Sequence, residues 1–165
     1  MTRTIIALIA AAFVTAAPAM GATWKEDSTG DDGNWSNLYQ SGVQPGWDGT
    51  VPNAVDAVVR IDDSTYGTST ILLDMNATVG DLQGQNRTTA VINSDGIHVL
   101  TLQASSGAAF VEPSGRANMT LNPPIVLGSD VEFQHHNSTW GHAHDFNVSG
   151  NISGSGNILV DQDAS

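Results

Sequence analysis

The sequence predicts an all-β fold of the β-solenoid kind, in which short strands stack in successive coils. Short apolar runs rich in β-branched residues recur from residue 57 onward, with starts about 6 to 13 residues apart. Gly, Asn, Asp and Ser separate the runs, and no segment of useful length has helical periodicity. The expected strands are 57–61, 70–74, 78–82, 90–92, 98–102, 108–111, 119–121, 124–127, 131–133, 146–148, 151–152 and 158–160.

Run length and composition favour a solenoid over the alternative, a sandwich or barrel. Many runs offer only two or three inward residues, and aromatic residues make up 6% of the chain. A sandwich of this length would ordinarily have longer strands and a heavier aromatic core. At about 20–25 residues a coil, residues 57–160 give about four or five coils.

The first 22 residues have the pattern of a secretory signal peptide. Arg3 lies in a short basic start, an apolar run follows at residues 5–17, and Ala17-Pro18-Ala19 supplies a cleavage sequence. A second cleavage position follows Ala22. The pattern predicts a secreted, extracellular or cell-surface protein whose mature chain does not insert into a membrane.

Residues 23–56 differ from the rest of the chain. They carry Trp24, Trp35 and Trp47 among turn-forming Gly, Asp, Asn and Pro, with no sustained periodicity. We expect this Trp-rich segment to fold back as a cap over the first end of the coils. The coils themselves are expected to occupy residues 57–165.

Charge and cysteine content exclude some functions. The formal net charge is −12, and only Lys25, Arg60, Arg87 and Arg116 remain as cations after the leader. Nucleic acids and anionic lipids need clusters of Lys and Arg, so neither is expected as a partner. The chain has no cysteine, so its stability cannot come from disulfides.

The segment QHHNSTWGHAHDF (134–146) holds four of the five histidines. Its candidate metal ligands are His135, His136, His142, His144 and Asp145, because imidazole and carboxylate groups bind Zn²⁺, Ni²⁺ or Cu²⁺. The alternative is a polar loop that protrudes from one coil, and this interpretation is favoured. Zn²⁺ or Ni²⁺ binding is then adventitious, and no cofactor is expected.

Other stretches give weaker indications of chemistry. DSTGDDG (27–33) has carboxylates and glycines, but it fits neither the EF-hand spacing nor a calcium β-roll, so calcium is not expected. Asp130 and Glu132 share a strand face, and Asp62 and Asp63 follow Arg60, but such pairs occur by chance in an acidic chain. No nucleophile elbow or phosphate loop is present, and we expect no enzymatic activity.

Two stretches resemble autotransporter-associated β-strand repeat proteins, which are exported bacterial proteins. The first has Thr23-Trp24, Gly33-Asn34-Trp35-Ser36, Pro52-Asn53 and Asp56-Ala57-Val58, as the openings of that family do. The second, residues 152–160, reads ISGSGNILV and is similar to the repeat itself. The resemblance implies a right-handed parallel β-helix that serves as surface or extracellular material and has no catalytic residues common to the family.

The chain departs from this family pattern at its end, where DQDAS (161–165) stands in place of a further repeat. It is either a truncated product or a short relative whose Asp161 and Asp163 blunt the last strand. We expect a non-enzymatic structural or adhesive module that self-associates through residues 158–160 or binds surface glycans. The alternatives are a carbohydrate-binding or carbohydrate-cleaving β-helix, which an exposed Trp47 or Trp140 would favour, and metal capture by the histidine segment.

Overall fold

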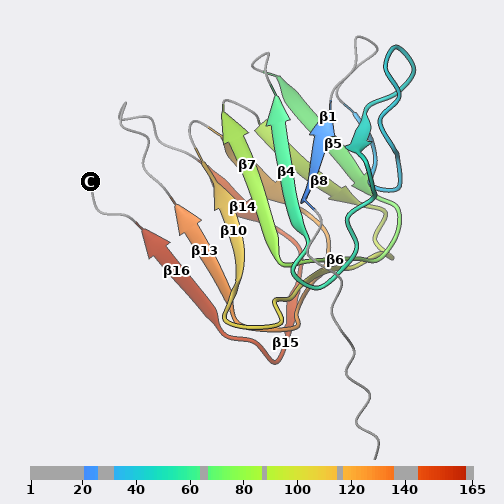
Figure 1. The fold of residues 1–165 in the computed structure, drawn as a ribbon. Coiled ribbons are helices and arrows are strands. Elements are labelled where there is room, and N and C mark those ends of the chain that lie inside the picture. The colour runs from blue at the N-terminus through green and yellow to red at the C-terminus, as the bar shows by residue number, and fades with distance from the viewer. Residues whose placement is uncertain are drawn as a thin grey trace, which may run out of the picture.

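The computed structural model describes residues 21–25, 32–63, 67–86, 89–114, 117–135 and 145–162, which form three sheets (Figure 1). These residues form sixteen strands and no helix, so the all-β prediction is confirmed. All strand pairs run parallel except β1 with β3, which is antiparallel. Nothing in the described part of the chain has the helical length and apolar character that a membrane crossing needs.

The largest sheet has seven strands in the order β16-β13-β10-β7-β4-β1-β3. Its strands are β1 (Gly21–Lys25), β3 (Gly46–Asp48), β4 (Val58–Asp63), β7 (Asp81–Asn86), β10 (Ala109–Pro113), β13 (Val131–His135) and β16 (Ile158–Gln162).

The two other sheets have the orders β14-β11-β8-β5-β2 and β15-β12-β9-β6. The five-stranded sheet consists of β2 (Gly33–Asn34), β5 (Thr68–Leu73), β8 (Thr89–Ser94), β11 (Asn118–Leu121) and β14 (Phe146–Val148). The four-stranded sheet consists of β6 (Ala77–Val79), β9 (Leu100–Leu102), β12 (Ile125–Leu127) and β15 (Ile152–Gly154).

The chain visits the three sheets in one repeated order. β4, β5 and β6 supply one strand to the seven-, five- and four-stranded sheet in turn, and β7–β9, β10–β12 and β13–β15 do the same. We call each set of three strands a layer. Because each strand pairs with the strand three places later, parallel ladders join neighbouring layers on all three sheets.

Alternate residues of the strands form the core. The register aligns Val59, Leu82, Val111 and Phe133 in successive strands of the seven-stranded sheet, and none of them is more than 7% exposed. The residues that alternate with them along each strand face outward, as the two-residue period of a strand requires. Full burial of an aliphatic side chain stabilises a fold by about 1.5–3 kcal/mol, so these stacked rows are a main source of stability.

The expected strand at residues 78–82 is wrong in one respect, because it contains a corner between two sheets. β6 ends at Val79 and β7 begins at Asp81. A Cβ atom on Gly80 would lie 2.5 Å from Cα of Asp56, so the side-chain-free residue allows two backbone segments to meet here. The backbone N–H groups of Gly80 and Asp81 both donate to the carbonyl of Ala57, at 2.9 and 3.0 Å.

The first end of the sheets is formed by β1, β2 and β3, strands that the sequence pattern does not reveal. β1 runs parallel to β4, with Ala22 beside Val59, and β3 pairs antiparallel with the other side of β1. β1 begins at Gly21, inside the range expected for the signal peptide. Residues 23–25, at the start of the Trp-rich segment, therefore belong to the seven-stranded sheet.

Trp24, Trp35 and Trp47 are completely buried at this first end. The ring of Trp47 makes edge-to-face contacts with the rings of Trp24 and Trp35, at centroid distances of 5.0 and 4.9 Å. Nε1 of Trp47 donates to the carbonyl of Trp35 at 2.7 Å, and Nε1 of Trp35 donates to that of Pro52 at 3.0 Å. Nε1 of Trp24, in contrast, is buried without a hydrogen-bond partner. The packing of the three rings therefore stabilises this end more than their polar contacts do.

The last strands of the sheets are β14, β15 and β16, and among the described residues each pairs on one side only. Their inward positions continue the core rows, and no following layer lies among the described residues. Ile152, Ile158 and Val160 are 41%, 46% and 62% exposed, whereas the inward residues of the preceding strands are buried. We call β14, β15 and β16 with these side chains the open end.

Candidate functional site

The histidine-rich segment connects β13 of the seven-stranded sheet to β14 of the five-stranded sheet. His135 is the last residue of β13, and its backbone is in register with Gln162 of β16. Asp145 is exposed just before β14, and its backbone N–H donates to Oδ1 of Asn118 at 2.9 Å. The structure therefore places His135 and Asp145 at the two ends of the connection between β13 and β14.

The other candidate ligands, His136, His142 and His144, lie outside the described residues. Among the residues that the structure does describe, no group of three or more His, Asp or Glu side chains is arranged to hold a metal ion. Metal binding by the histidine segment stays a prediction.

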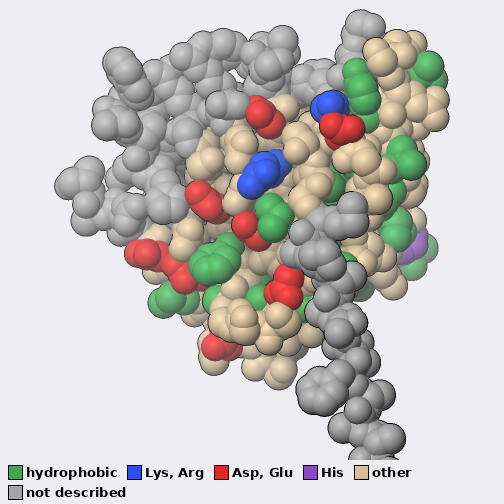
Figure 2. Space-filling view, viewed as in Figure 1, with side chains coloured by type: hydrophobic (Ala, Val, Ile, Leu, Met, Phe, Trp, Pro, Cys, Tyr) green, Lys and Arg blue, Asp and Glu red, His purple; other side chains and the backbone are tan. Residues whose placement is uncertain are grey.

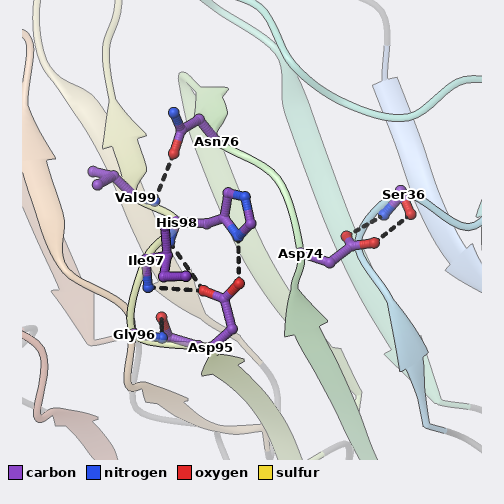
Figure 3. Close-up of polar contacts among 9 residues, drawn as sticks. Ser36, Asp74, Asn76, Asp95, Gly96, Ile97, His98 and Val99 are labelled. Atoms are coloured by element: carbon purple, nitrogen blue, oxygen red, sulfur yellow. Dashed lines mark hydrogen bonds and ion pairs between the residues drawn. The ribbon is translucent and has the colours of Figure 1, made fainter.

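Figure 3 shows a corner where the five-stranded and four-stranded sheets meet, and its polar side chains bind backbone of neighbouring layers. Oδ1 of Asp74 accepts from the N–H of Ser36 at 3.0 Å, and Oδ2 accepts from its hydroxyl at 2.6 Å. Oδ1 of Asn76 accepts from the N–H of Val99 at 3.0 Å. These contacts satisfy backbone groups that the corner leaves without a ladder partner.

The carboxylates of Asp32, from the stretch at 27–33, and of Asp130 and Glu132 also accept hydrogen bonds from amide groups. Oδ1 of Asp32 accepts from the N–H of Thr70 at 3.0 Å, whereas residues 27–31 lie outside the described part. Oδ1 of Asp130 accepts from both the backbone and the side-chain N–H of Asn157, at 2.8 and 2.9 Å. Oε1 of Glu132 accepts from the amide of Gln134 at 2.7 Å. The contacts of Asp32 and Asp130 join neighbouring layers, whereas the contact of Glu132 lies within β13.

The fifth histidine, His98, forms a pair with Asp95 that the sequence analysis does not predict. Oδ2 of Asp95 lies 2.6 Å from Nδ1 of His98, and its Oδ1 accepts from the N–H groups of Ile97 and His98 (Figure 3). The backbone N–H groups of His98 and Ile97 hold the pKa of Asp95 below its usual value. An Asp-x-x-His sequence next to a glycine is the signal that could have found this turn.

Asp81 is the carboxylate with the most unusual environment on the outward face of the seven-stranded sheet. Burial raises its pKa, and the nearby charge of Glu112 raises it further. Nε2 of Gln83 donates to Oδ2 of Asp81 at 2.9 Å, while Oδ1 is buried without a hydrogen-bond partner. Acidic side chains are spread over this face (Figure 2).

A ladder of neutral polar side chains crosses three layers between the five-stranded and four-stranded sheets. The hydroxyl of Ser149 donates to Oδ1 of Asn122 at 2.5 Å, and Nδ2 of Asn122 donates to Oδ1 of Asn93 at 2.7 Å. The ladder borders a hollow of about 340 Å³, whose lining side chains are amides, hydroxyls and a proline, with glycine between them.

The tryptophan that would favour carbohydrate binding by an aromatic platform is not available in the described structure. Trp47 is completely buried, and Trp140 lies outside the described residues. A sugar site on this chain, as far as it is described, has to rely on polar side chains instead.

Comparisons of the chain with protein-family models, curated protein sequences and solved structures give no match.

Proposed function

We propose that the chain is an exported, non-enzymatic structural module built as a right-handed parallel β-helix, similar to autotransporter-associated β-strand repeat proteins. The repeated order of strands through three sheets and the parallel ladders between layers support this architecture. Crossovers between parallel strands of one sheet are right-handed in about 98% of cases, which supports the handedness. The buried tryptophans act as the cap of its first end.

The open end is the observation that carries the proposed role. Its side chains Ile152, Ile158 and Val160 occupy core rows yet stand 41–62% exposed. Three strand edges beside exposed apolar side chains make a template for further strands. We infer that a second copy of the chain covers this end and that association of copies gives the module its structural or adhesive role.

The two copies meet through their open ends rather than head to tail. At the first end, β3 already pairs with the outer edge of β1, and buried tryptophans close the core there. Two β16 strands can instead pair antiparallel about a two-fold axis at Val160, which places Asp161 opposite Leu159 of the second copy. Such a contact is isologous, so it closes at a dimer and does not grow into a fibre.

The leader is removed after Ala19 rather than after Ala22. Cleavage at Ala19 leaves Gly21 and Ala22 in the mature chain, where β1 pairs them with Val58 and Val59. Ala22 is 1% exposed, so cleavage after it would remove a buried core residue.

Display of the mature chain on bacterial cells tests the adhesive role. Cells that carry the wild-type chain are expected to aggregate, whereas cells that carry Val160→Asp should stay dispersed, because a buried unpaired charge opposes the contact. Ile97→Asp is the matched control, since Ile97 is 78% exposed and lies away from the open end, between β8 and β9. Equal aggregation of all three cell types would reject the role of the open end.

A further inference from the structure

The hollow beside the polar ladder has the properties of a ligand site, and its last lining residues adjoin the open end. It is formed by residues of three consecutive layers, which lie before or within the connections β8–β9, β11–β12 and β14–β15. Its volume of about 340 Å³ falls in the lower part of the range for small-molecule sites. Stacked parallel strands hold all three connections, so the recess has a rigid support.

The chemistry of the lining restricts the class of ligand. None of the lining side chains carries a charge or an aromatic ring. A phosphate, sulfate or metal ion would have no counter-charge there, and the net charge of −12 repels anions. The site therefore fits an uncharged polar molecule.

The side-chain amides of Asn93 and Asn122 are held in place by hydrogen bonds but retain unused donor and acceptor positions. A side-chain amide offers two N–H donors and an oxygen with two acceptor positions. Asn122 uses one donor toward Asn93 and one acceptor position toward Ser149. The remaining capacity provides donors and acceptors side by side, and a hydroxyl group can pair with either kind.

We propose that this hollow binds a neutral saccharide of about two sugar units, through hydroxyl contacts with Asn93, Asn122, Asn151 and Ser149. Pro124 supplies an apolar surface for the C–H groups of a sugar ring. This ligand class combines neutral charge with many hydroxyls that both donate and accept. Binding at this site goes beyond the structural role proposed above and does not depend on it.

Calorimetric and NMR titrations with cellobiose, maltose, lactose, mannobiose and N,N′-diacetylchitobiose test the proposal. At least one of these disaccharides is expected to bind saturably, and glucuronic acid-containing disaccharides should bind more weakly. Asn151→Ala should weaken binding by about tenfold, the value of one well-placed hydrogen bond. Ser153→Ala is the control, because Ser153 lies next to the site in β15 but does not line the hollow.

The outcomes separate this proposal from the role of the open end. Asn93→Ala is a second variant, and its melting temperature shows whether it folds before it is titrated. No saturable binding of any of the five neutral disaccharides, or equal affinity in Asn151→Ala and Ser153→Ala, overturns the saccharide site. Binding that persists in Val160→Asp while cell aggregation is lost supports the site independently of association.

Discussion

The two ends of the sheets differ in how their last side chains are covered. At the first end Trp24, Trp35 and Trp47 are 0% exposed, and β3 lies outside β1. At the open end Ile158 and Val160 are about half exposed, although the register places them in the same core rows. Among the described residues, the core is therefore closed by tryptophans at the first end and leaves Ile158 and Val160 exposed at the other.

The largest expected effect is a difference in stability between substitutions at the two ends. Trp47→Ala removes a buried ring that contacts two other tryptophans, and it should lower the free energy of unfolding by about 3–5 kcal/mol. Val160→Ala removes an exposed side chain and should change that free energy by less than about 0.5 kcal/mol. Urea unfolding of dilute protein measures both values. Similar losses for the two variants would show that the ends do not differ as described.

A smaller effect concerns the beginning of β1. A chain that starts at Thr23 lacks Gly21 and Ala22, and it should be less stable than a chain that starts at Met20 by about 1–2 kcal/mol. Thermal unfolding of the two chains measures the difference. Amino-terminal sequencing of the exported protein should begin at Met20. A start at Thr23 together with unchanged stability would contradict the assigned contribution of β1.

Asp81 lies in a layer between the two ends, so the effect of its substitution on stability serves as a reference for both ends. Because burial raises its folded-state pKa above 3.8, its ionised form opposes folding at neutral pH. Asp81→Asn should therefore increase the free energy of unfolding at pH 7 by less than about 1 kcal/mol, since the side chain is partly solvated. The gain should shrink as pH falls through the raised pKa and disappear below about 3.8.

Denaturant unfolding across this pH range tests the sign of the effect. Asp145→Asn is the control, because Asp145 is exposed and its substitution should change stability by less than about 0.5 kcal/mol. A wild-type chain that is more stable than Asp81→Asn at pH 7 would show that this carboxylate is stabilised by its surroundings instead.

The smallest expected effect is the response of association to salt. The open end carries the exposed carboxylates of Asp145 and Asp161, which repel their counterparts in a second copy. Raising the salt concentration to about 0.5 M shortens the screening length and should strengthen the dimer by a few-fold. Light scattering at two salt concentrations measures this change. Weaker association at high salt would indicate a contact based on attraction between charges.

The sequence predicts the strands better than it predicts the first end. Each of the twelve expected runs overlaps a strand, because alternation of apolar residues reports directly on the core rows. β2 and β3 have two and three residues, too few for an alternation to be seen. β2 is placed by its pairing with β5, and β3 by its pairing with β1. Both partners are distant in the sequence.

The candidate sites are harder to predict from the sequence, because they depend on which connections between strands lie next to each other in the fold. The histidine segment is visible in the sequence by its composition alone. The ladder of Asn93, Asn122 and Ser149 is not visible, because its members are separated by whole layers and meet only through the strand register. His98 likewise acquires its partner Asp95 from the conformation of a turn.

Sedimentation velocity of the mature chain, over a concentration series and beside Val160→Asp, tests most directly whether the open end is an association surface. We expect a monomer–dimer equilibrium for the wild-type chain, with no larger species, and a monomer for the variant. A wild-type chain that stays monomeric at high concentration, or that forms open-ended polymers, would contradict it.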